Sequence, residues 1–139
     1  MFHNIMVAFD ESPEAKKALN TAIELTKALS AELDVVTVLE PLPIYFSFST
    51  LAAPVIDWTD EQRTRCVALQ IEARRLAEAA GIIFRTELVS GGEVNGIIEC
   101  AKKYRADLLV LGMRKHQLLV GHTTHDIAEH SPCPLLGVR

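Results

Sequence analysis

The sequence has few of the residues that crosslink, interrupt or disorder a chain. Three of its 139 residues are cysteine, with no CxxC pair among them, and it contains seven Gly and six Pro. A chain of this length can bury a core without crosslinks, so these numbers exclude a disulfide scaffold and a disordered or low-complexity protein. We therefore expect unpaired thiols and a reducing, cytoplasmic location.

The chain also lacks an excess of positive charge. It has 14 basic and 18 acidic residues, a formal net charge of −4, so its overall balance gives no reason to expect a nucleic-acid or membrane partner. The N-terminal segment reaches Asp10 without a long apolar run, and we expect neither a signal peptide nor a membrane anchor. Any site for an anion must therefore be local.

Hydrophobic residues make up 49% of the chain, and we expect one domain with one core over residues 1–139. Short β-branched runs alternate with segments of helical spacing, a pattern typical of a parallel sheet with crossover helices. This predicts an α/β fold, a doubly wound, Rossmann-like sheet of five parallel strands. We take its strand order to be 3-2-1-4-5, in which the first and fourth strands are neighbours. The predicted strands are residues 4–9, 33–39, 82–89, 106–111 and 134–138, and the predicted helices are residues 13–29, 60–80, 94–104 and 123–130.

Two strand ends carry residues that suggest a ligand site. Asp10 follows the first strand and Gly112 follows the fourth, and in such sheets ligands bind outside the carboxyl ends where the strand order reverses. Asp10 could bind a ribose or a base, serve as a phosphoacceptor or metal ligand, or only cap the helix that begins near Ser12. A phosphoacceptor is disfavoured, because a receiver domain needs an Asp at the end of the third strand, which here reads Leu88–Ser90.

The loop between the fourth strand and the last helix is a second candidate. Gly112 and Gly121 flank it, and glycines together with a helix N-terminus can cradle a phosphate. The same two glycines also fit an ordinary turn and helix start. Within the loop, Arg114, Lys115 and His116 form a basic cluster that either contacts an anion or is simply solvated.

Residues 41–57 form a long connection with three prolines and no helical spacing. Long loops in compact domains are often functional or mobile. The alternative is a flap that folds onto the domain's own core, or a contact surface formed by the apolar residues 44–46.

Four of the five histidines lie within fifteen residues near the C-terminus. On a helix His122, Asp126 and His130 share one face, with His125 close by, and such spacing can hold zinc. Surface histidines are often spaced in the same way, and no cysteine pair accompanies these, so we predict no metal site.

Three segments occur in an order that a known family shows. They are Ile5–Ser12, Ala106–Gly112, and an ending formed by Leu118–Gly121 and His130–Leu136. Together they resemble the universal stress protein family over essentially the whole chain. The resemblance implies a five-stranded parallel α/β fold, a homodimer through the last strand and, in one branch of the family, ATP at the point where the strand order reverses.

The phosphate motif of that branch fits this chain only in part. It reads Gly, two residues, Gly, nine residues, and Gly followed by Ser or Thr. Gly112 and Gly121 match the outer glycines, but Lys115 replaces the middle one, five residues instead of nine precede Gly121, and His122 replaces the hydroxyl residue. The phosphate half of the site is therefore altered.

The resemblance also implies roles for individual residues. Asp10 matches the acidic residue near the ribose, and Val38 lies where the second strand's backbone meets adenine. The expected adenosine end is Ala8, Phe9, Asp10 and Val38, and the expected phosphate end is Gly112, Met113, Arg114, Lys115, Gly121, His122, Thr123 and Thr124. We expect weaker or altered binding of an adenine nucleotide, ATP, ADP or AMP, with Mg²⁺ as a possible companion.

The leading hypothesis is a small cytoplasmic stress-response regulator that binds an adenine nucleotide and acts as a homodimer or through partners. The alternative is a dimeric interaction module of the same fold that has lost the nucleotide. An enzyme, at most a slow ATPase, is disfavoured, because no nucleophile with an oriented base can be read from the sequence. If the histidines belong to the altered phosphate end, anion affinity should rise as the pH falls through about 6.5.

Overall fold

The computed structural model describes residues 1–40, 52–114 and 123–139. Its five strands form one sheet in the order β3-β2-β1-β4-β5, and all four pairings are parallel. The predicted strand order is therefore confirmed. The elements are β1 (Asn4–Ala8), α1 (Pro13–Leu29), β2 (Glu32–Leu39), α3 (Ala52–Ala80), β3 (Ile83–Ser90), α4 (Glu93–Lys103), β4 (Leu108–Gly112), α5 (Thr123–His130) and β5 (Leu135–Val138).

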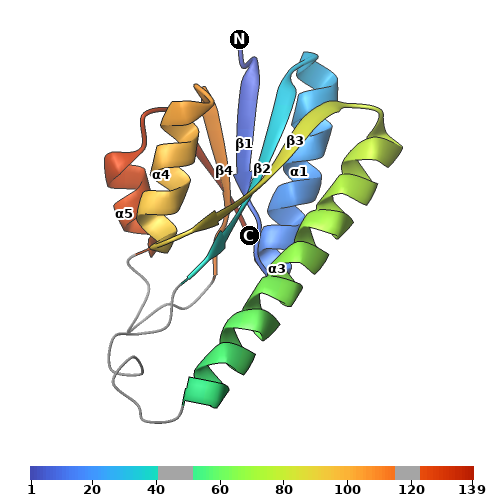
Figure 1. Cartoon of the computed structure of the whole chain (residues 1–139). Coiled ribbons are helices and arrows are strands. Elements are labelled where there is room, and N and C mark those ends of the chain that lie inside the picture. Colours follow the sequence, from blue (N-terminus) through green and yellow to red (C-terminus); the bar gives the residue numbers. More distant parts are fainter. Residues whose placement is uncertain (41–51, 115–122) are drawn as a thin grey trace.

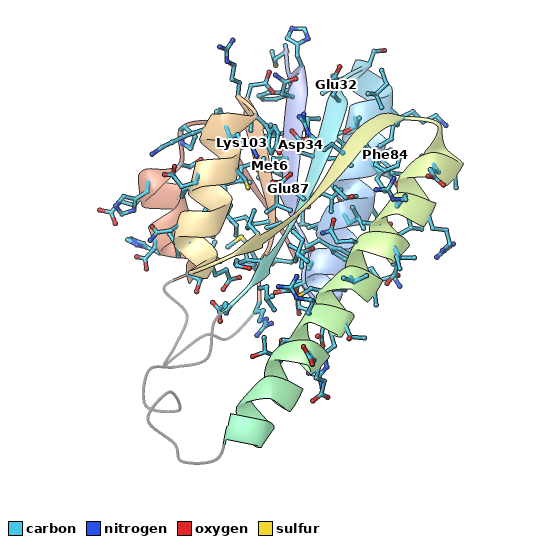
Figure 2. The ribbon with its side chains drawn as sticks, in the orientation of Figure 1. Met6, Glu32, Asp34, Phe84, Glu87 and Lys103 are labelled. Carbon is cyan, nitrogen blue, oxygen red and sulfur yellow. The ribbon has the colours of Figure 1, made fainter. Side chains whose placement is uncertain are left out.

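Helices cover both faces of the sheet (Figure 1), and two apolar clusters hold the layers together. Side chains of a strand alternate between faces, so Ile5 and Val7 pack with α1 and α3, whereas Met6 packs with α4 and α5. Figure 2 shows Met6 on the α4 side of the sheet and Phe84 beside α3. Ile5, Met6 and Val7 are all 0% exposed, as the unbroken apolar run of the first strand predicts.

The ends of α1 follow from its sequence. The Ser12 Oγ accepts a hydrogen bond from the Ala15 N–H at 3.1 Å, and Pro13 occupies the first helical position, where its missing N–H costs nothing. Ser30 ends the helix in the left-handed conformation, with φ of 53°. The predicted bounds of this helix are confirmed, and they fix the turn that connects Asp10 to it.

The start of α3 corrects one prediction. The helix begins at Ala52, so residues 52–57, expected to belong to an irregular connection, are helical. Pro54 is tolerated because it lies in the first turn, where backbone N–H groups have no partner within the helix. With 29 residues α3 is about 43 Å long, and its N-terminal part extends past the carboxyl ends of the strands (Figure 1). The rest of the expected loop, residues 41–51, lies outside the described residues.

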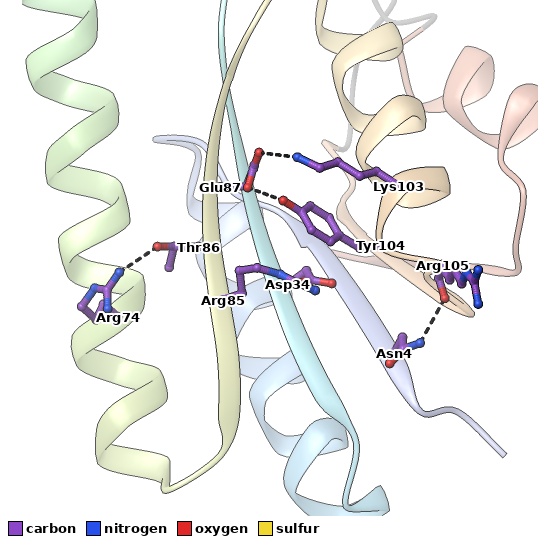
Figure 3. Close-up of polar contacts among 9 residues, drawn as sticks. All are labelled: Asn4, Asp34, Arg74, Arg85, Thr86, Glu87, Lys103, Tyr104 and Arg105. Carbon is purple, nitrogen blue, oxygen red and sulfur yellow. Dashed lines mark hydrogen bonds and ion pairs between the residues drawn. The ribbon is translucent and has the colours of Figure 1, made fainter.

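A polar network joins the C-terminal end of α4 to β2 and β3 (Figure 3). The Arg85 Nε lies 2.6 Å from the Oδ1 of Asp34, which is 5% exposed, and the Arg85 guanidinium stacks on the Tyr104 ring at 3.8 Å. The Tyr104 hydroxyl donates to Glu87 Oε2 at 2.6 Å, and Lys103 Nζ lies 3.4 Å from Glu87 Oε1. These contacts hold the end of α4 on the sheet where apolar packing gives way to polar side chains.

Replacing Tyr104 with phenylalanine should weaken this network. The Tyr104 hydroxyl, followed by Lys103, lowers the pKa of Glu87. A carboxyl whose pKa is lower in the folded state stabilises the fold above its unfolded pKa, about 4.3, and this contribution is lost as the pH falls through the folded value. We expect Tyr104→Phe to lower the free energy of unfolding by about 1 kcal/mol at pH 7, and by less at pH 3. Urea unfolding at both pH values measures this, and an equal loss at both would contradict the assigned role of Glu87.

Candidate functional site

A cleft of about 490 Å³ opens at the carboxyl ends of β1, β2 and β4. This is where the strand order reverses, with β1 between β2 and β4. Apolar side chains form its inner wall, and polar groups come from the segments that follow the strands. The described lining residues are Ala8, Phe9, Asp10, Ser12, Ala15, Val36, Val38, Glu40, Gln62, Glu93, Ile97, Leu111, Gly112, Arg114, Thr123, Thr124 and Ile127.

The cleft brings together most of the residues that the sequence singles out. Residues from both the expected adenosine end and the expected phosphate end line it, although more than 70 residues separate Val38 from Gly112 in the chain. The expected residues that line the cleft are Ala8, Phe9, Asp10, Val38, Gly112, Arg114, Thr123 and Thr124. Lys115, Gly121 and His122 lie outside the described residues.

Met113 is the expected site residue that the structure places elsewhere. It is absent from the described lining of the cleft. Its N–H donates to the Val138 carbonyl at 2.6 Å, and its thioether packs where a side chain at Gly137 would be. Met113 therefore continues the β4–β5 pairing through its backbone, and its side chain packs against Gly137 of β5.

Asp10 both shapes the turn after β1 and lines the cleft. Its Oδ1 accepts a hydrogen bond from the Ser12 N–H at 2.8 Å, while Ser12 itself is the N-cap of α1. Phe9, expected to be the last residue of the first strand, follows the end of β1 at Ala8. Its N–H still donates to the Val36 carbonyl at 2.8 Å, so the pairing with β2 continues up to Asp10.

A buried hydrogen-bond chain holds the peptide that precedes Asp10. The Phe9 carbonyl accepts from Thr37 Oγ1 at 3.0 Å, and this hydroxyl accepts from Gln70 Nε2 of α3 at 2.5 Å. Thr37 is 2% exposed, and a buried hydroxyl that both donates and accepts is well satisfied. The backbone next to the cleft is therefore fixed from β2 and α3 at once.

Gly112 has a packing role that does not depend on any ligand. A Cβ at this position would lie 2.5 Å from the Glu14 carbonyl carbon and 2.6 Å from the Ala15 nitrogen. The absence of a side chain lets the end of β4 contact the first turn of α1 directly. Gly112 thus brings the Arg114 segment close to Asp10. Because packing alone requires a glycine here, the presence of Gly112 does not by itself indicate phosphate binding.

Carboxylates outnumber cations along the described lining of the cleft. Asp10, Glu40 and Glu93 face a single guanidinium, Arg114. Burial raises the pKa of Glu93, and the charges of Glu40 and Asp10 raise it further, whereas Arg114 lowers it. The electrostatic potential that these neighbouring charges create at Glu93 is therefore negative on balance.

Sequence reasoning did not single out Glu40, Gln62 or Glu93. Glu40 follows β2 and Glu93 begins α4 after β3, so the rule that selected Asp10 and Gly112 also points to both. Gln62 carries no such signal, because it reaches the cleft through the N-terminal part of α3, which extends beyond the sheet.

Of the C-terminal histidines, His125 and His130 lie on the described helix α5, and His116 and His122 lie outside the described residues. The His130 Nδ1 lies 2.9 Å from the Asp126 main-chain oxygen, so this ring nitrogen faces its own helix backbone and not the Asp126 carboxylate. His125, Asp126 and Glu129 have ligand atoms within 4.8 Å of one another, but His125 and Glu129 are exposed and Asp126 is only partly buried. This is the arrangement expected of neighbouring side chains on a solvated helix.

Among the described helices, none combines the length and the apolar composition that crossing a membrane requires.

Several solved structures share this fold. The chain superposes on the universal stress protein UspA from Lactobacillus plantarum with a TM-score of 0.83 at 23% identity, covering 99% of this chain and 98% of that one. Three other similar structures are described with nucleotides. A universal stress protein in complex with cAMP has a TM-score of 0.71 at 23% identity, with 99% and 97% coverage. A universal stress protein family protein from Arabidopsis thaliana with AMP has a TM-score of 0.73 at 16% identity, covering 98% of this chain and 90% of that one. A universal stress protein from Archaeoglobus fulgidus with dAMP has a TM-score of 0.74 at 20% identity, covering 99% of this chain and 98% of that one.

Sequence relationships extend over the whole chain. The model of the "Universal stress protein family" matches residues 1–139. "Universal stress protein YxiE" from Bacillus subtilis is 28% identical over 148 residues, and "Universal stress protein in QAH/OAS sulfhydrylase 3'region" from Thermus aquaticus is 30% identical over 146 residues. Each alignment covers 100% of this chain and 100% of the relative. Sequence blocks, strand order and these relatives agree, and the chain belongs to the universal stress protein family.

Proposed function

We propose that this protein is a cytoplasmic stress-response regulator that binds an adenine nucleotide in the cleft at the carboxyl ends of β1, β2 and β4. The observation that carries the proposal is that Asp10 and Val38, expected at the adenosine, line one cleft with Arg114, Thr123 and Thr124, expected at the phosphates. The structures described with cAMP, AMP and dAMP support the same ligand class.

The adenosine is proposed to bind at the ends of β1 and β2. Ala8, Phe9 and Val38 lie along this part of the cleft, and Val36 and Ile97 add apolar surface for the base. The Asp10 carboxylate can accept a hydrogen bond from a ribose hydroxyl. The bond between its Oδ1 and the Ser12 N–H keeps the carboxylate in place before the ligand arrives.

The phosphates are proposed to bind between Gly112 and the start of α5. Arg114 supplies a cation, and Thr123 and Thr124 supply hydroxyl and N–H groups at the first turn of α5. Lys115, Gly121 and His122 are proposed to complete this end. Loss of two or three phosphate contacts relative to an intact motif should weaken ATP binding by about 10²- to 10⁴-fold, with or without Mg²⁺. The altered end thus favours ligands with fewer phosphates.

A homodimer through β5 is part of the proposal. β5 lies at one edge of the sheet, and an edge strand offers unpaired backbone groups to a second copy. Light scattering at several protein concentrations should give twice the mass of one chain, and a monomer throughout would contradict this part. The alternative function, a dimeric interaction module without nucleotide, is favoured by Lys115 in place of a motif glycine.

Calorimetric titration with AMP, ADP and ATP, each with and without Mg²⁺, tests the proposed function. Mass spectrometry of the freshly purified protein adds a search for nucleotide that copurifies. We expect binding to at least one adenine nucleotide in the micromolar to millimolar range. The absence of any binding at millimolar nucleotide would overturn the proposal in favour of the interaction module.

A further inference from the structure

Carboxylates from three different elements meet in the cleft. Asp10 follows β1, Glu40 follows β2, and Glu93 is the first residue of α4. The Gly91 N–H donates to the Leu39 carbonyl at 3.1 Å, which joins the segments that carry Glu40 and Glu93. Gly91 makes this turn with φ of 138°, a conformation that other residues rarely adopt. The backbone therefore fixes the positions from which these two carboxylates enter the cleft.

The charges facing Glu93 can be counted element by element. Asp10 comes from the end of β1, Glu40 from the end of β2 and Arg114 from the segment after β4. The lining residues described on α3 and α5 are uncharged: Gln62, Thr123, Thr124 and Ile127. The described lining therefore holds three carboxylates and one guanidinium. Glu93 is partly buried, and solvent screens its charge less than that of a fully exposed group.

We infer that this set of carboxylates (Asp10, Glu40 and Glu93) makes the cleft selective for nucleotide charge, with Glu93 as the residue that most strongly disfavours ligands with two or three phosphates. The inference rests on the proposed function and adds the ligand class: adenosine compounds with one phosphate. Arg114, together with Lys115 as proposed for the phosphate end, gives two cations against the three carboxylates of the cleft. Each phosphate beyond the first therefore adds repulsion from carboxylates that follow β2 and begin α4. A divalent cation on the phosphates relieves this repulsion.

A series of ligands that differ only in phosphate number tests the inference. Dissociation constants of adenosine, AMP, ADP and ATP are measured without Mg²⁺ at pH 7.5 and low salt for the native protein, Glu93→Gln and Glu99→Gln. Glu99 is the matched control, because it lies on α4, is exposed and pairs with Lys102. We expect Glu93→Gln to raise the affinity for ATP about tenfold more than that for adenosine. Glu99→Gln should change the affinities for ATP and adenosine by the same factor. Added salt should reduce the Glu93→Gln effect.

The outcomes separate this inference from the proposed function. If native protein binds adenosine or AMP but Glu93→Gln changes all four constants by the same factor, the charge selectivity is wrong and the nucleotide site stands. If Glu93→Gln weakens ATP binding specifically when Mg²⁺ is present, Glu93 holds the cation and the inference is also wrong. If native protein binds none of the four ligands, both proposals fail.

Discussion

Replacing Gly112 with alanine should destabilise the protein by about 1–3 kcal/mol and weaken AMP binding at least tenfold. The added Cβ would lie 2.5 Å from the Glu14 carbonyl carbon, 2.6 Å from the Ala15 nitrogen and 2.8 Å from the Glu14 oxygen. These are backbone atoms, so no side-chain rotation relieves the overlap, and α1 or β4 must shift. The shift separates Arg114 from Asp10, which reduces binding as well as stability. Urea unfolding and calorimetric titration measure the two effects.

Gly92→Ala is the matched control for this substitution. No atom lies within 4 Å of a Cβ at Gly92, and its φ of −67° suits alanine. Only its position as the N-cap of α4 is weakened, at a cost of up to about 1 kcal/mol. Equal unfolding free energies for Gly112→Ala and the native protein would show that α1 and β4 are not in the contact described above.

The positions of most elements could be predicted from periodicity, and the doubly wound parallel sheet from the alternation of strands and helices. The apolar run of Asn4–Ala8 indicates a strand buried on both faces, and Ser12 followed by Pro13 marks a helix start by local chemistry alone. The start of α3 could not be predicted in this way. Pro54 suggests a break in a helix, but a proline interrupts a helix only beyond the first turn, and Pro54 lies within the first turn of α3. Whether a proline lies in a first turn depends on where the helix begins, which that stretch of sequence does not indicate.

The site was predictable where it follows from topology. The carboxyl ends of β1 and β4 had to meet, and they bring Asp10 and Gly112 to one cleft. Contacts between distant polar side chains were not predictable, since nothing in the spacing of Thr37 and Gln70 distinguishes them from surface residues. The packing role of Gly112 was not predictable from the phosphate motif either, because the backbone atoms that require a glycine there belong to Glu14 and Ala15, far away in the sequence.

Asp10→Ala should weaken the binding of adenosine itself by about 10- to 100-fold, whereas Arg114→Ala should weaken only phosphorylated ligands. A hydrogen bond from the ribose to a carboxylate is common to all adenosine compounds, and a lost charge-assisted bond costs about 1.5–3 kcal/mol. Arg114 faces the phosphate end, so its loss should be small for adenosine and should grow from AMP to ATP. For Asp10→Ala the loss should be largest for adenosine and smallest for ATP, because removing the carboxylate also removes repulsion of the phosphates.

Two variants separate binding from folding in this comparison. Asp10→Asn keeps an oxygen that can accept from the Ser12 N–H, so the turn before α1 is preserved while the charge is removed. Glu11→Ala removes an exposed carboxylate one residue away that does not line the described cleft, and it should leave all four dissociation constants within about twofold. If Asp10→Ala and Arg114→Ala changed the adenosine, AMP and ATP constants by the same factors, the two ends of the cleft would not divide the ligand as proposed. A loss of adenosine binding confined to the Asp10 variants would place the ribose at the end of β1.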